Sequence, residues 1–165
     1  MDFLAEGEIV DYTDAYQRAG EAVSILAEDA KRTGVSIGLE NVWNKFLVSP
    51  LEMARFLDEV GSPWVGAYFD VGNALYNGYP EHWIRALGSR IKKVHWKDYR
   101  CAAGGLHGFV DLLAGDVNWP GVMKSLEDVG YCSWVTAEMI PQYAHYTDQI
   151  IYNTSQSMDR ILAGK

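Results

Sequence analysis

Apolar residues recur along this chain in two patterns: long segments with spacings of three and four, and short continuous runs. In residues 11–32 the apolar side chains repeat at intervals of three and four, which predicts a helix with one buried face, and Gly34 is placed to end it. The sequence Ser-Pro-Leu-Glu at residues 49–52 is a typical helix start, so a second helix is expected to run to about Val60. Further helices are predicted over residues 81–87, 120–129 and 147–162.

Short β-prone runs lie between the predicted helices. They cover residues 35–39, 65–69, 91–94 and 133–137. Because helices and strands alternate without a linker, we expect an α/β protein with a parallel sheet and helical crossovers. Two architectures fit this order, an open doubly wound sheet and part of a (β/α)8 barrel. No glycine-rich phosphate-binding loop follows a strand, which weakens the nucleotide-binding alternative.

A residue that can bind a metal stands at the end of every predicted strand. The four residues are Glu40, Asp70, His95 and Glu138. Polar residues at the carboxyl ends of all strands are typical of barrel enzymes, whose complete barrel takes about 250 residues. Residues 1–165 supply only four strands, so we expect them to form a single half-barrel domain of the (β/α)8 type.

Taken singly, each of the four residues has a simpler explanation. A glutamate can cap the next helix, Asp70 can form an Asx turn, and a lone histidine is more often structural than a ligand. Together they favour a divalent metal, because a parallel barrel brings the ends of its strands to one place. Three carboxylates and one imidazole, with no thiolate, suit Mn²⁺ best; Mg²⁺, Co²⁺ and Zn²⁺ are possible, and a closed structural zinc site fits less well.

Such a metal can polarise a carbonyl group and stabilise an enediolate. Glu40 and Glu138 can then remove a proton beside the carbonyl and return one. Return to the opposite face of the same carbon gives an epimer, and return to the neighbouring carbon gives an aldose–ketose isomer.

Composition excludes several other classes of function. The chain has 14 Lys and Arg against 22 Asp and Glu, a net charge of −8, and is a poor candidate for binding nucleic acid or anionic membranes. No run approaches the roughly 18 apolar residues of a membrane span. Residues 1–10 do not resemble a signal peptide, and Cys101 and Cys132 are too few for a disulfide framework. We therefore expect a cytoplasmic protein.

Five segments resemble the second-half motifs of the xylose-isomerase-like sugar phosphate isomerase/epimerase superfamily, whose members are TIM barrels. They are residues 38–41, 69–73, 94–98, 115–119 and 136–139. The resemblance covers about residues 11–162. It implies that the chain holds about four C-terminal βα units and lacks the first four. It also implies metal ligands at Glu40, Asp70, His95 and Glu138, with Glu40 and Glu138 as acid and base.

The chain departs from part of that pattern. Asn73 stands where free-ketose epimerases of the superfamily usually place a histidine that contacts substrate, and asparagine can still hydrogen-bond a hydroxyl. Lys97 and Asp98 look more like the hexulose-6-phosphate isomerase and pentulose-5-phosphate 3-epimerase branch. Lys97 can ligate a substrate oxygen there, with Arg100 nearby. A surface ion pair between Lys97 and Asp98 is the simpler alternative.

Trp43 and His107 complete the candidate substrate contacts. Trp43 and Trp96 follow ligand positions, and each can form an apolar wall under a sugar or pack on a helix. His107 lies in the long glycine-rich connection after the third strand, where it can act as a lid residue or simply be an exposed loop histidine.

The function predicted best is a metal-dependent sugar or sugar-phosphate isomerase or epimerase. One alternative is an inosose-type dehydratase on the same scaffold, and another is a non-catalytic metal-binding or assembly fragment. An endonuclease of the same superfamily fits less well, because it needs more metal ligands and a basic groove. A half-barrel leaves two strand edges unpaired, so the expected macromolecular partner is a second copy of the chain or a missing N-terminal half-barrel.

Overall fold

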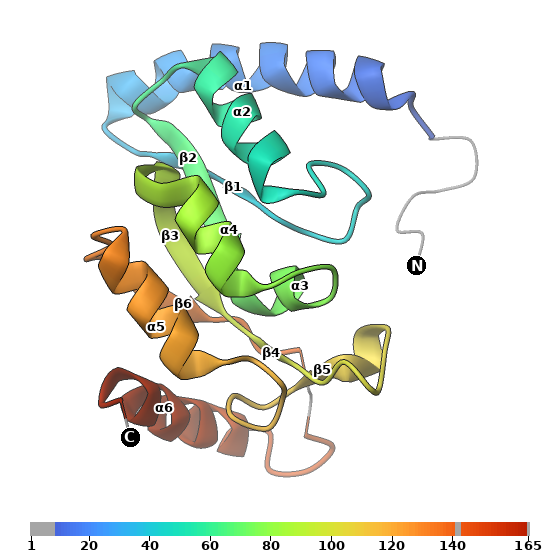
Figure 1. Cartoon of the computed structure of the whole chain (residues 1–165), viewed down its shortest axis with the longest axis vertical. Coiled ribbons are helices and arrows are strands. Elements are labelled where there is room, and N and C mark those ends of the chain that lie inside the picture. Colours follow the sequence, from blue (N-terminus) through green and yellow to red (C-terminus); the bar gives the residue numbers. More distant parts are fainter. Residues whose placement is uncertain (1–8, 141–142, 165) are drawn as a thin grey trace.

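The computed structural model describes residues 9–140 and 143–164, in which helices and strands alternate as expected (Figure 1). The main sheet contains β1 (Ile37–Glu40), β2 (Val65–Asp70), β3 (Ile91–Trp96) and β6 (Val135–Ala137). The strands pair in the order β1-β2-β3-β6, and every pairing is parallel. The carboxyl ends of all four strands therefore lie along one edge of the sheet.

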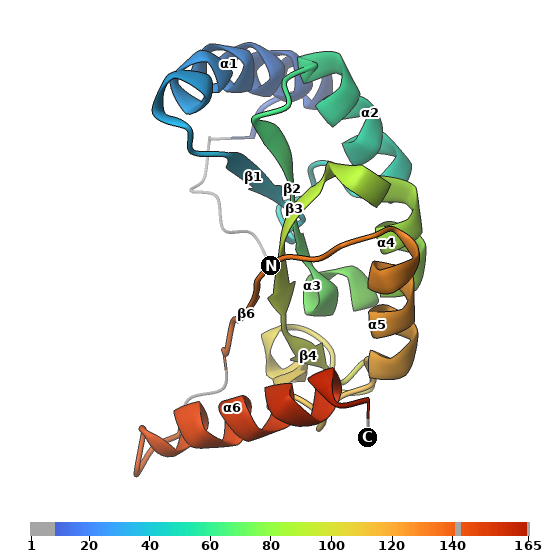
Figure 2. The same ribbon diagram turned by 90° about the vertical axis from the view of Figure 1, so that its left-hand side faces the viewer.

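Helices cover one face of this sheet. They are α1 (Tyr12–Thr33), α2 (Pro50–Val60), α3 (Val71–Leu75), α4 (Pro80–Leu87), α5 (Trp119–Asp128) and α6 (Gln149–Leu162), with a 3₁₀ turn, η1 (Gly88–Arg90), before β3. Figure 2 shows α2, α4 and α5 along the covered face, with α1 and α6 at the two ends of the sheet. No described helix combines the length and apolarity needed to cross a lipid bilayer. The one-sided cover matches a sector of a barrel wall.

The core lies between the sheet and the covering helices. Phe69, Val94 and Trp96 on the strands are completely buried, and they share one apolar cluster with Met53 of α2 and Ile84 of α4. Burying a side chain of this size contributes roughly 1.5–3 kcal/mol. The core thus anchors the strands from one side and leaves the other side available for polar groups.

Local sequence signals set where two helices near the strand ends begin. Ser49 accepts a hydrogen bond from the backbone N–H of Glu52 (3.2 Å) at the start of α2, as the Ser-Pro-Leu-Glu sequence predicts. Helix α3 follows β2 without a loop, and Asp70 is its N-cap. The sequence does not predict α3, because five residues are too few to show helical periodicity.

The connection after β3 is more ordered than its glycine-rich sequence predicts. Strands β4 (Asp98–Tyr99) and β5 (Phe109–Val110) pair antiparallel, and the 3₁₀ turn η2 (Leu106–Gly108) precedes β5. Strands of two residues give no readable alternation, which is why the sequence does not reveal this hairpin. The ring of Phe109 stacks on Trp43 with 4.8 Å between ring centroids, so the hairpin packs against the segment that follows β1.

The uncovered face of the sheet carries small and polar residues. The Tyr68 hydroxyl donates to the hydroxyl of Thr136 (3.2 Å) across this face. A side chain at Gly38 would place its Cβ 2.9 Å from the Cβ of Tyr68, so glycine leaves room for the tyrosine ring. Within the described residues, β1 and β6 each pair on one side only. As far as residues 9–140 and 143–164 show, both outer edges of the sheet can accept further strands.

Candidate metal centre

The parallel sheet brings the four strand-end residues together. Glu40 is the last residue of β1, Asp70 is the last of β2, and His95 lies opposite Asp70 in the register of β3. Glu138 directly follows β6, and its backbone N–H donates to the carbonyl of Trp96 (3.0 Å). Each of the four offers one ligand atom within 4.8 Å of the others. We call these four residues the quartet.

His95 lies at the centre of the quartet. Its Nδ1 is 3.0 Å from Oε1 of Glu40, 3.7 Å from Oε2 of Glu138 and 3.9 Å from Oδ2 of Asp70. The ring of Tyr68 packs on the imidazole with 4.0 Å between ring centroids. The tyrosine ring thus packs on the imidazole, whose Nδ1 faces all three carboxylates.

Asp70 is the deepest and most firmly held member. Its Oδ1 accepts from the backbone N–H of Asn73 (2.6 Å) at the start of α3. The side chain of Asn41 holds the backbone of Asp70 twice, accepting from its N–H (2.8 Å) and donating to its carbonyl (2.9 Å). Asn41 was not among the residues predicted from the sequence, although its place directly after Glu40 in a Gly-Leu-Glu-Asn motif is a usable signal.

Lys97 lies inside the site rather than on the surface. Its Nζ is 3.1 Å from Oδ2 of Asp70 and 2.6 Å from Oε2 of Glu138, and its side chain is 5% exposed. The ammonium also lies 4.9 Å from the centre of the Phe109 ring. It is thus an internal counterion: three carboxylates and one lysine leave a formal charge of −3 + 1 = −2.

Burial and the lysine act in opposite directions on the two carboxylates. Burial raises the pKa of Asp70 to about 6, against the pull of the Lys97 ammonium. Burial also pushes the pKa of Glu138 upward, but contact with Lys97 outweighs it and holds that pKa below its usual value. Burial lowers the pKa of Lys97, but the two carboxylates outweigh this effect and raise it. Glu138 and Lys97 are therefore charged at neutral pH.

The donor set fits a divalent cation. Oδ2 of Asp70 and Oε2 of Glu138 are buried and accept no hydrogen bond from the described residues, although both lie within ion-pair distance of Lys97. Buried carboxylate oxygens are normally hydrogen-bonded, and these two share a single ammonium group, which leaves each with capacity for a further partner. With Glu40 and His95 they make an oxygen-rich set with one nitrogen, which suits Mn²⁺ or a similar ion.

The affinity of this site for Mn²⁺ is expected to fall as the pH falls below about 6. Asp70 must lose its proton to act as a ligand, and its pKa of about 6 means that it is increasingly protonated below that pH. One competing proton weakens binding about tenfold per pH unit. Calorimetric titrations between pH 7.5 and 5 would measure this slope. The same dissociation constant at pH 7 and pH 5 would contradict it.

Asp98 is buried away from the quartet. Its carboxylate accepts from the backbone N–H groups of Tyr99 (2.9 Å), Leu113 (2.9 Å) and Val117 (3.2 Å), and from the indole N–H of Trp119 (3.1 Å). The residue is completely buried. In this environment the carboxylate holds the connection after β3 in place and forms no surface pair with Lys97.

The remaining candidate contacts lie around the quartet at different depths. Asn73 is buried, donates to the carbonyl of Asn41 (3.0 Å) and accepts from Lys97 (3.4 Å). Trp43 donates to the carbonyl of Asn73 (3.0 Å). Arg100 is exposed and donates to the carbonyl of Ala114 (2.5 Å), so it faces the base of the hairpin connection.

His107 lies exposed in η2, on the hairpin that packs against Trp43. Trp96 packs on Trp119 with 5.3 Å between ring centroids and is completely buried. Of the two possibilities for Trp96, the structure therefore shows packing beneath a helix and not a wall of the site.

Comparison with known proteins identifies the family. The family model for the xylose isomerase-like TIM barrel matches residues 4–159. The rhizopine catabolism protein MocC of Rhizobium meliloti is 27% identical over 149 residues, which cover 80% of this chain and 46% of that protein. The putative L-ribulose-5-phosphate 3-epimerase SgbU of Escherichia coli strain K12 is 29% identical over 128 residues, covering 74% and 44%. The chain thus spans about half the length of the curated relatives it matches.

A solved structure shares the fold of this chain. The D-psicose 3-epimerase of Clostridium cellulolyticum H10 superposes with a TM-score of 0.78 at 18% identity, over 97% of this chain and 60% of that one. At this identity the likeness concerns the fold alone. The family match runs from residue 4 into α6 and contains all four members of the quartet. The chain belongs to the xylose isomerase-like TIM-barrel family.

Proposed function

We propose that the chain carries the metal and proton-transfer site of a sugar or sugar-phosphate isomerase or epimerase. The observation that supports this most is the quartet, in which three carboxylates surround one imidazole at the carboxyl ends of four parallel strands. Two of the carboxylate oxygens are buried and share the Lys97 ammonium, which lies 3.1 and 2.6 Å from them. Substrates with a carbonyl group beside a hydroxylated carbon suit this arrangement, because their reaction needs an acid, a base and a Lewis acid together.

The quartet would hold the metal, with Mn²⁺ as the first choice. A bound ion of this kind would polarise the carbonyl of the sugar. Asp70 and His95 are the more enclosed members and suit a purely structural role as ligands. Their side chains are 0% and 16% exposed, against 29% for Glu40 and 45% for Glu138. The two glutamates are therefore the members that a substrate reaches.

Glu40 and Glu138 would transfer the proton through an enediolate. Glu40 ends β1 and Glu138 directly follows β6, the two outermost strands of the four, so they approach the site from opposite sides. The lowered pKa of Glu138 keeps it ionised and able to accept a proton. Proton removal on one side and return on the other inverts a carbon, which favours epimerisation over isomerisation.

The other candidate residues receive different roles in this proposal. Lys97 and Asn73 are buried beside Asp70 and position the quartet, and Asp98 positions the hairpin connection. Arg100 and His107 are exposed near the hairpin and are the groups available to a hydroxyl or phosphate. Trp43, partly buried between Asn73 and Phe109, supplies an apolar wall.

We also propose that further βα units complete the barrel around the two open edges of the sheet. A second copy of the chain or a separate half-barrel would each supply four more parallel strands. Two copies would bring two sites, each with a formal charge of −2 for the quartet together with Lys97, to one barrel mouth, and this repulsion favours a half-barrel with fewer acidic strand ends. Light scattering of the purified chain would distinguish a dimer from a monomer.

Proton exchange with solvent is the direct test of the proposed function. The full chain, with Mn²⁺ in D₂O, is expected to introduce deuterium next to the carbonyl of D-ribulose 5-phosphate, D-fructose or D-fructose 6-phosphate, as followed by NMR. EDTA should abolish the exchange. Loss of a hydroxyl group would favour the dehydratase alternative. A chain that binds Mn²⁺ but exchanges none of these sugars would contradict the proposal.

A further inference from the structure

The ammonium of Lys97 contacts the same two oxygen atoms that the quartet would offer to a metal. Its Nζ lies 3.1 Å from Oδ2 of Asp70 and 2.6 Å from Oε2 of Glu138, and both oxygens are buried. A divalent cation at these oxygens would carry a charge of the same sign as the ammonium. Because like charges at such distances repel strongly away from bulk water, Lys97 opposes cation binding.

The fold builds this position of Lys97 into the end of β3. Lys97 follows β3 directly and is buried against Gly72 at the start of α3. A Cβ at residue 72 would lie 2.9 Å from the Cβ of Lys97 and 2.8 Å from its carbonyl oxygen. Glycine at this position therefore lets the lysine pass close to α3, within reach of the quartet.

A second set of contacts for the ammonium lies beside the first. Oδ1 of Asn73 is 3.4 Å from Nζ, and the centre of the Phe109 ring is 4.9 Å from it. The side chain of Asn73 is held by its bond to the carbonyl of Asn41 (3.0 Å). Trp43 donates to the carbonyl of Asn73 (3.0 Å) and stacks on Phe109, so it ties the two contacts together.

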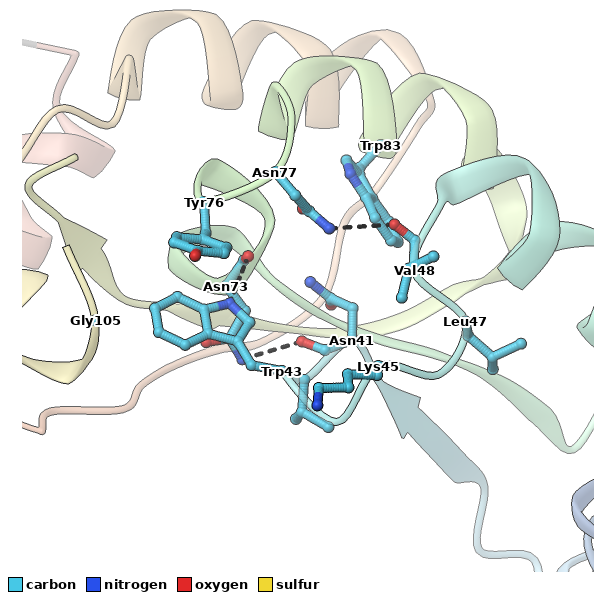
Figure 3. A pocket seen from close by; sticks show the side chains of 11 residues that line it. Asn41, Trp43, Lys45, Leu47, Val48, Asn73, Tyr76, Asn77, Trp83 and Gly105 are labelled. Carbon is cyan, nitrogen blue, oxygen red and sulfur yellow. Dashed lines mark hydrogen bonds between the residues drawn. The ribbon is translucent and has the colours of Figure 1, made fainter. Parts of the chain in front are cut away.

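Figure 3 shows the two hydrogen bonds of Asn73, to Trp43 and Asn41, at the wall of a cavity. The amide oxygen and the aromatic ring thus belong to a fixed part of the structure. Both attract an ammonium group, and the flexible stem of a lysine allows its head to shift between neighbouring partners. The ammonium can therefore withdraw from the carboxylates without losing every partner.

We propose that Lys97 is a built-in competitor of the metal at the quartet. Its ammonium holds Asp70 and Glu138 together, and it withdraws toward Asn73 and Phe109 when a divalent cation binds. The quartet and Lys97 have a formal charge of −2, so a dication with the lysine still present gives −2 + 2 = 0. The lysine thereby matches the site to a double charge and keeps the ion exchangeable. This inference rests on the proposed function, because it assumes that the quartet binds a metal.

Lys97→Met is expected to bind Mn²⁺ at least about tenfold more tightly than the unaltered chain, because it removes the competing charge and keeps an unbranched stem. In EDTA the same variant should unfold at a lower urea concentration, since the buried carboxylates lose their counterion. Calorimetric titration with Mn²⁺ at pH 8 and urea unfolding would measure the two effects. A residue that merely supports the fold would lower both the stability and the affinity.

Lys93→Met is the matched control. Lys93 lies on β3 two residues before His95, and its Nζ donates to the hydroxyl of Ser133 (3.4 Å). The same loss of charge there should leave Mn²⁺ affinity unaltered. If the unaltered chain binds Mn²⁺ and Lys97→Met binds it equally or more weakly, this inference fails and the proposed function stands. If neither protein binds Mn²⁺, both fail.

A crystal structure of the unaltered chain with Mn²⁺ tests the withdrawal without a variant, and so holds even if Lys97→Met does not fold. Nζ of Lys97 is expected more than about 4 Å from the two carboxylate oxygens, beyond ion-pair distance, and closer to Asn73 or Phe109. An ammonium that keeps both carboxylate contacts beside bound Mn²⁺ would overturn the proposal.

Discussion

Glu138→Gln is expected to slow metal-dependent proton exchange by about 10²- to 10⁴-fold, the usual contribution of a positioned acid or base. The amide keeps the size of the side chain and an oxygen that can still face the metal, but it cannot accept a proton. Glu138 is ionised at neutral pH, because Lys97, 2.6 Å from its Oε2, holds its pKa below the usual value. Exchange rates at saturating Mn²⁺ would be measured by deuterium uptake into the sugar.

Glu127→Gln is the matched control for this experiment. Glu127 lies on α5, its side chain is 77% exposed, and its nearest cation is Lys124 on the same helix. The same chemical change there should leave the rate unaltered. If Glu138→Gln binds Mn²⁺ and exchanges at the rate of the unaltered chain, Glu138 is not the acid or base.

Asp70→Asn is expected to be more stable than the unaltered chain in the absence of Mn²⁺ and less stable than the unaltered chain in its presence. The variant should lose more than about 100-fold in Mn²⁺ affinity, because it replaces the most buried ligand oxygen. Without metal it should be more stable at pH 7.5 than the unaltered chain. The amide retains an oxygen to accept from the N–H of Asn73 but removes a buried charge.

The pKa of Asp70 gives the size and pH range of this effect. Folding raises the pKa of Asp70 from 3.8 to about 6. The protonated form of Asp70 therefore stabilises the fold below pH 3.8, and this contribution is lost as the pH rises through about 6. The difference of about two units corresponds to roughly 3 kcal/mol as an upper bound. Urea unfolding of both proteins at pH 4 and pH 7.5, with EDTA or Mn²⁺, would measure it. A less stable metal-free variant at pH 7.5 would contradict the expectation.

The four parallel strands were predictable because each is a short apolar run between helical segments. The polar residues at the strand ends converge because the strands are parallel. Asp70 and His95, for example, lie opposite one another on adjacent strands. The hairpin of β4 and β5 was not predictable, because its strands are only two residues long. Its order also depends on the carboxylate of Asp98, which accepts four hydrogen bonds from residues 99–119.

The inward position of Lys97 could have been predicted from the alternation of side chains along the strand. Strand residues alternate between faces, so Lys97 lies on the same face as His95, two residues earlier, and Asp98 lies on the same face as Trp96. Asp98 and Trp96 both meet Trp119 in the core, as this alternation requires. A surface pair was one of two interpretations of Lys97 and Asp98, the other being a substrate contact by Lys97. Burial of Lys97 is compensated by Asp70 and Glu138, which lie far away in sequence.

The central claim, that the quartet binds one metal ion, is tested most directly by electron paramagnetic resonance of Mn²⁺ bound to the chain. One Mn²⁺ per chain is expected, with magnetic coupling to a single histidine nitrogen that disappears in His95→Gln. His107→Gln, an exposed histidine on the hairpin, should retain the coupling. No nitrogen coupling in the unaltered chain, or coupling that survives His95→Gln, would show that the metal binds elsewhere.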